Sequence, residues 1–120
     1  MKLETAKEFN ERYDREKKEC VARLETIYHP LGPLEKMLVG WLAHSEWMLK
    51  NIQTMMAYCQ ARNVPEPHGQ QVLDQLARSH QWHRRSLKRT EKQLRGYQKA
   101  RLRADKLLPV YKPVEYLYVQ

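Results

Sequence analysis

The chain has 120 residues, a net charge of +8 and a charged fraction of 30%. This length predicts one domain, and the abundance of Lys, Arg, Glu, Gln, Leu and Ala is typical of helical bundles and coiled coils. No stretch approaches 18 consecutive apolar residues and no apolar run opens the chain, so we expect neither a membrane span nor a signal peptide.

The first predicted helix covers residues 3–28. Its apolar residues recur on one stripe, at Ala6, Phe9, Tyr13, Cys20, Leu24 and Ile27. The segment HPLGP, residues 29–33, holds two prolines and one glycine and should end this helix. Pro33 then suits the first position of a second helix.

The second predicted helix covers residues 33–62 and is the most apolar segment. Its stripe follows steps of four and three residues, at Leu34, Leu38, Trp41, Ser45, Met48, Ile52, Met55 and Cys59. Four more apolar residues widen the stripe and indicate the core helix: Met37, Leu42, Leu49 and Met56. Trp47 lies off the stripe and should face a third packed element. We expect Trp41, Trp47 and Trp82 to anchor the core or an interface, with stacking on bases as the alternative.

The third predicted helix covers residues 69–106. Its inward seam is expected at Leu73, Leu76, His80, His83, Leu87, Thr90, Leu94, Tyr97, Arg101 and Ala104. About 37 residues span roughly 55 Å, against roughly 45 Å for about 30 residues, so its end should project beyond the second helix or meet another subunit. Residues 107–120 contain Pro109 and Pro113 and predict an extended aromatic tail. This tail either folds back on the bundle or adds to a partner.

Positive charge in the third predicted helix recurs every three or four residues, on one helical face. We define this basic stripe as Arg85, Lys88, Lys92, Arg95, Lys99, Arg103 and Lys106. Residues 78–106 hold eleven Lys and Arg against Glu91 and Asp105, a net charge of +9, while the rest of the chain carries −1. A rigid helix with a cation at every turn can follow a nucleic-acid backbone. A solvated helix face is the alternative, but such faces usually alternate in sign.

Three residues beside or within this segment are secondary candidates for contact with nucleic acid: Trp82, His83 and Arg89. His83 also occupies a seam position. Metal-binding bundles use a Glu-x-x-His pattern, which this chain lacks, so no metal or other cofactor is expected. A metal-binding bundle that rests on His80 and His83 alone is the alternative. No nucleophile motif or phosphate-binding glycine loop is present, so we do not expect an enzyme.

The two cysteines, Cys20 and Cys59, have neither CxxC nor Cys/His spacing. Isolated cysteines of this kind favour reduced thiols in a cytoplasmic, bacterial-type setting. A Cys20–Cys59 disulfide is the alternative if the helices place the two thiols face to face.

Two segments resemble a family of small helical proteins from bacterial genomes, especially planctomycetes and acidobacteria. The first resemblance lies in residues 30–52, at Gly32, Pro33, Glu35, Leu38, Val39, Ala43 and Trp47. The second is an Arg-rich helix in residues 78–101, with matches at Arg78, Arg85, Leu87, Arg89, Leu94, Tyr97, Gln98 and Arg101. The chain lacks the Asn-Ala-x-Lys-His-Gly-Leu segment of longer members. The resemblance implies a helical-hairpin core and no particular activity.

Together these features predict an all-α fold: an antiparallel three-helix bundle or long helical hairpin in residues 1–106, followed by the extended tail. The function expected is non-catalytic binding of nucleic acid, as an accessory subunit of a ribonucleoprotein or a DNA-processing complex of a mobile element or defence system. Arg85, Lys88, Lys92, Arg95, Lys99 and Arg103 would contact phosphates, and RNA or single strands suit the Arg and aromatic content better than duplex DNA. The alternative is a protein–protein adaptor or oligomeric scaffold that docks on an acidic partner. A membrane surface is not expected as a partner, because polar residues such as His80 and Thr90 lie opposite the charges.

Overall fold

The computed structural model describes residues 4–62 and 68–107. It contains three helices: α1 (Ala6–Tyr28), α2 (Gly32–Ala61) and α3 (His68–Leu107). The all-α prediction is confirmed, and each predicted helix boundary lies within three residues of the observed one. The predictions for the aromatic tail fall on residues 108–120, which are outside the described residues.

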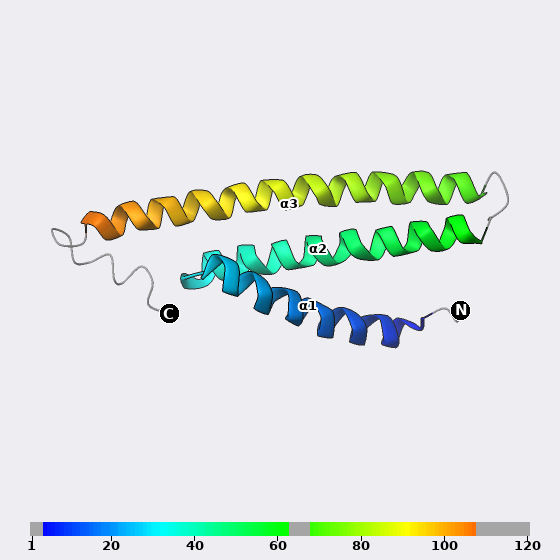
Figure 1. Cartoon of the computed structure of the whole chain (residues 1–120), viewed down its shortest axis with the longest axis horizontal. Coiled ribbons are helices and arrows are strands. Elements are labelled where there is room, and N and C mark those ends of the chain that lie inside the picture. Colours follow the sequence, from blue (N-terminus) through cyan, green and yellow to red (C-terminus); the bar gives the residue numbers. More distant parts are fainter. Residues whose placement is uncertain (1–3, 63–67, 108–120) are drawn as a thin grey trace.

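The three helices form an elongated molecule with extents of 68 × 26 × 18 Å. Figure 1 shows α2 between its two neighbours: α3 runs antiparallel along one side, and α1 crosses the other side at an angle. The C-terminal end of α3 extends past the start of α2, as the difference in predicted length requires (Figure 1). Since α2 is the element that packs against both others, its sequence has to supply two apolar faces.

The ends of α1 and the start of α2 follow from local sequence. Thr5 caps α1, because its hydroxyl oxygen accepts a hydrogen bond from the backbone N–H of Glu8 over 3.1 Å. His29 ends the helix in the left-handed conformation, with φ 48°. Gly32 begins α2 with φ 78°, which favours glycine, and Pro33 occupies its first turn. The turn predicted at residues 29–33 is therefore confirmed.

The core lies where α2 meets both neighbours. It consists of Cys20, Leu24, Leu38, Val39, Leu42, Ala43 and Leu94, with Val21, Tyr28 and Leu87 packed around them. Cys20 and Cys59 are free thiols, so the prediction of reduced cysteines is confirmed.

Trp47 joins α1 to α2 through aromatic contacts. Its buried ring meets Phe9 and Tyr13 of α1 edge-on, with ring centroids 5.4 and 4.8 Å apart. The Arg12 guanidinium lies over the indole, 5.1 Å from its centroid. The prediction that Trp47 faces a third packed element is confirmed, and that element is α1.

Trp41 and Trp82 do not anchor the core, because their side chains are 52% and 64% exposed. The expectation that they anchor an interface stays a prediction. Five other predicted inward positions are also exposed: Ala6, Ile27, Leu34, Met37 and Met55. The physical reason on α2 is that its apolar stripe is wider than the surface that α1 and α3 cover. One edge of α2 therefore remains open.

The predicted seam of α3 is largely confirmed. Its residues from Leu73 to Ala104 are buried or half-buried, with one exception: Tyr97 is 47% exposed. Gln98 turns inward in its place. The Gln98 side-chain amide donates to the backbone oxygen of Tyr28 over 2.7 Å and to the Glu35 carboxylate over 3.2 Å. Gln98 and not Tyr97 faces inward here because the fold places two polar partners, Tyr28 and Glu35, next to Gln98.

A buried ion pair fastens α3 to the turn between α1 and α2. The Glu35 carboxylate accepts from the Arg101 Nε over 3.0 Å, and the two side chains are only 6% and 13% exposed. The same carboxylate accepts from the backbone N–H of Leu31 over 3.3 Å and from Gln98. With three donors in contact, the desolvation cost of burying Glu35 is largely offset.

Replacing Glu35 with Gln should lower the free energy of unfolding by about 3 kcal/mol, because Arg101 is left as a buried charge without its main partner. Asp105, 4.0 Å from Arg101, keeps the loss at the low end of the usual range. Urea denaturation followed by circular dichroism measures this change. Glu11→Gln, at an exposed position of α1, is the matched control and should change stability by less than about 0.5 kcal/mol.

The double variant Glu35→Leu with Arg101→Met should recover most of the lost stability, since an apolar pair can replace a buried ion pair at little cost. Equal midpoints for Glu35→Gln and Glu11→Gln would show that the buried pair does not hold the helices together.

Candidate nucleic-acid interface

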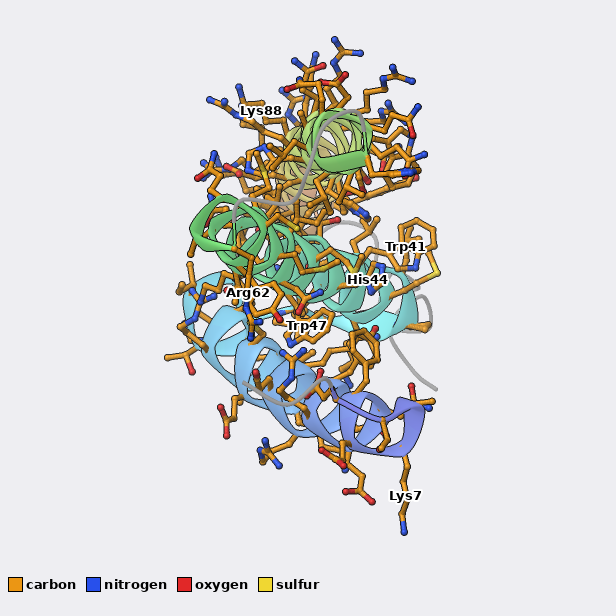
Figure 2. The ribbon with its side chains drawn as sticks, turned by 90° about the vertical axis from the view of Figure 1, so that its right-hand side faces the viewer. Lys7, Trp41, His44, Trp47, Arg62 and Lys88 are labelled. Atoms are coloured by element: carbon orange, nitrogen blue, oxygen red, sulfur yellow. The ribbon has the colours of Figure 1, made fainter. Side chains whose placement is uncertain are left out.

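The basic stripe lies on the side of α3 that faces away from α2. All seven of its residues are exposed, and Arg85 to Lys106 covers about 32 Å of helix. Figure 2 shows Lys88 at the outer side of α3, far from Lys7 on the opposite side of the molecule. The structure therefore brings the predicted phosphate-contacting residues together on one accessible face.

The positive charge of the chain is concentrated on this helix. Within α3, eleven Lys and Arg face only three acidic residues, a net charge of +8. In α1, six basic residues balance six acidic ones, and α2 has two of each. The electrostatic potential of the molecule is thus strongly asymmetric and is most positive along α3.

Few carboxylates neutralise the stripe. Glu91 accepts from Arg95 over 3.0 Å at an exposed position, where such a pair contributes little. Arg101 belongs to the core, because it pairs with Glu35. Among residues 4–62 and 68–107, the remaining stripe residues have no carboxylate within 4.0 Å of their charged nitrogens: Arg85, Lys88, Lys92, Lys99, Arg103 and Lys106.

A shallow hollow interrupts the outer face of α3 near Gly96. It is bordered by Lys88, Glu91, Lys92, Arg95, Gly96 and Lys99. A Cβ added at Gly96 would meet no atom within 4 Å, so packing does not require glycine there. The missing side chain leaves space between the neighbouring lysine side chains. The signal for this position was available in the sequence, since a glycine in a helix interior costs about 1 kcal/mol relative to alanine.

The secondary candidates divide into two groups. Trp82 and Arg89 are exposed beside the stripe: Trp82 lies one turn before Arg85, and Arg89 one turn after it. His83 is only 8% exposed and faces inward. Its ring contacts Trp82 and His44, with centroids 4.8 and 6.0 Å apart. The seam position predicted for His83 is therefore confirmed, and its ring does not lie on the exposed face that carries the basic stripe.

Two histidines meet at the edge between α2 and α3. Burial lowers the pKa of His44, and the nearby positive charge of Lys17 lowers this pKa further. Burial also lowers the pKa of His83, with a smaller effect from His44. The His44 Nδ1 is paired with the Tyr13 hydroxyl at 2.8 Å, whereas the buried His83 Nδ1 has no hydrogen-bond partner among the described residues. Both rings are therefore held neutral near pH 7.

The stability of the fold should decrease as the pH falls from about 7 toward 5. Because both pKa values are lowered by folding, the unfolded chain takes up protons near its ordinary histidine pKa of about 6.5, before the folded chain does. The stability that the fold gains by keeping the His44 and His83 rings neutral is therefore present above about pH 6.5 and is lost as the pH falls below it. Thermal unfolding at several pH values measures this trend.

His83→Leu should make this pH dependence shallower, whereas His68→Gln, at an exposed position, should leave it unchanged. A wild-type stability that is flat between pH 7.5 and 5.5 would contradict the assignment.

A second hollow, of about 430 Å³, lies between α1 and α2 and includes Glu16, Cys20 and Arg23 in its lining. Two of its charged lining residues pair with neighbours outside the lining: Arg23 with Glu46, and Glu16 with Arg12. Across the described parts of the chain, no three His, Cys, Asp or Glu side chains gather closely enough to hold a metal ion. None of the three described helices is long and apolar enough to cross a membrane.

Comparison of the chain with protein-family models, curated proteins and solved structures gave no match. The resemblance to small helical bacterial proteins therefore stays a prediction, and the function has to be argued from the geometry of α3.

Proposed function

We propose that the chain is a non-catalytic nucleic-acid-binding protein that holds phosphates along the outer face of α3. The observation that carries this proposal is the basic stripe: seven exposed cations on one side of a continuous helix that carries a net charge of +8. Each phosphate that such cations neutralise releases condensed counterions, which favours binding. Arginine adds planar, bidentate contacts to phosphate oxygens.

Single-stranded nucleic acid, and RNA in particular, suits this surface better than duplex DNA. Trp82 is an exposed aromatic ring at the border of the stripe, near Arg85 and Arg89. Unpaired bases can stack on such a ring while their phosphates follow the cations. A straight helix that lacks a helix-turn-helix partner has fewer means of reading a duplex groove. The small size fits an accessory subunit of a ribonucleoprotein or DNA-processing complex.

Binding to single-stranded RNA should fall steeply with salt, with a slope of log K against log[salt] near −0.7 per phosphate contact. The variant Lys88→Gln, Lys92→Gln, Lys99→Gln removes three of the unpaired cations. We expect it to bind more weakly at low salt and to reduce the slope by about two. Filter binding or fluorescence anisotropy at several salt concentrations measures both quantities.

The matched control removes three exposed cations from α1: Lys7→Gln, Arg15→Gln, Lys18→Gln. It changes the net charge equally but lies away from α3, so its slope should equal that of the wild type. Equal losses in the two triple variants would reduce the effect to net charge and refute a site on α3.

The second candidate function is a protein–protein adaptor or scaffold. The observation that favours it is the open apolar edge of α2, where Trp41 is half-exposed. An adaptor that docks its basic stripe on an acidic protein would also bind in a salt-dependent way. It would, however, show no preference for oligonucleotides over an acidic peptide of equal charge, which the same anisotropy assay can compare.

A further inference from the structure

The open edge of α2 is regular as well as apolar. Leu34, Trp41, Met48 and Met55 recur every seven residues; three of them are exposed, and Met48 is half-buried. Leu38, Ser45 and Ile52 recur with the same spacing and are buried. Two parallel series at seven-residue spacing are typical of a helix that packs against other helices along both series. Among the described residues, neighbouring helices cover only the series that begins at Leu38.

The adjoining side of α3 continues this surface. His44 of α2 meets His83 of α3, so the two edges adjoin at this point, and Trp41 and Met48 lie within one turn of His44. On α3 the same flank carries Val72, Ser79, Ser86, Gln93 and Ala100, again at seven-residue spacing and without a charge. Figure 2 shows Trp41 and Lys88 on different sides of the molecule. The uncharged flank and the basic stripe are thus separate faces.

We propose that this uncharged face, α2's open edge with the adjoining flank of α3, packs against the same face of a second copy of the chain. The proposal rests on this face alone and not on the basic stripe. Its occupant should be helical, because knobs at seven-residue steps fit the holes of another helix. In a two-fold interface the same patch of each copy meets the other. A patch without charge can do this with no repulsion between like charges.

The size of the face agrees with a stable dimer. Leu34 to Met55 spans about 32 Å of helix, and two helices side by side are about 20 Å wide. The face therefore offers on the order of 600 Å², close to the roughly 800 Å² that each partner buries in a standard interface. A face of this size lies at the upper end of the apolar patches that monomers expose, and such patches are often functional. Such a pairing leaves both basic stripes outside.

Sedimentation equilibrium of the full chain tests the proposal, with 0.5 M salt present to release nucleic acid. We expect a mass of twice 14.5 kDa at micromolar concentration, and little change with salt because the face is uncharged. Trp41→Glu should raise the dissociation constant at least tenfold. The control Leu102→Glu alters a residue of similar exposure, 55% against 52%, on the other side of α3, and should leave the dimer intact.

Circular dichroism of both variants verifies that the helices remain folded. A wild-type monomer at about 100 µM would overturn the proposal, whether residues 108–120 or a different protein cover the edge instead. A dimer that Trp41→Glu and Leu102→Glu weaken equally would also overturn it. A dimer that dissociates at high salt would point to the charged surfaces and not to this face. None of these outcomes depends on whether the chain binds RNA.

Discussion

The buried carboxylate of Glu35 is the interaction on which the arrangement of the three helices depends. It joins the start of α2, through the backbone of Leu31, to Gln98 and Arg101 of α3. Gln98 in turn reaches the last carbonyl of α1, at Tyr28. A buried charge is costly unless every lone pair finds a partner, so alternative packings that leave Glu35 unpaired are disfavoured. Apolar contacts along α2 supply most of the stability, and this network selects one packing among those that bury a similar area.

The same network fixes which side of α3 faces solvent. Gln98 and Arg101 are three residues apart and meet one carboxylate, so α3 cannot rotate about its axis without breaking both contacts. A shift by one residue would turn the helix by about 100° and bring part of the basic stripe against the core. Cations at three- and four-residue spacing repel one another, and this cost is offset by packing at Leu87 and Leu94. A polyanion that binds the stripe would relieve the repulsion, which couples binding to stability.

Much of this arrangement is readable from the sequence, because strong local signals agree with the fold. The segment HPLGP sets the turn, and the regular spacing from Arg85 to Lys106 places every stripe residue in solvent. The errors arise where a tertiary contact decides. A wide apolar stripe does not reveal how much of it neighbouring helices cover, so the stripe alone does not show that Trp41 and Met55 are exposed. Gln98 replaces Tyr97 at the seam only because Glu35 and Tyr28 offer it partners. The sequence is compatible with His83 either on the inward seam or in contact with nucleic acid. Only the packing of the helices shows that its ring faces inward.

The central claim is that nucleic acid binds on the outer face of α3 while the core network keeps that helix in register. Backbone amide NMR of the labelled chain, titrated with a single-stranded RNA oligonucleotide, tests it most directly. We expect chemical-shift changes concentrated between Trp82 and Lys106, including Gly96 in the lysine-bordered hollow, with Glu35 and α1 nearly unchanged. Changes centred on α1 or on the open edge of α2, or no changes at low salt, would contradict it.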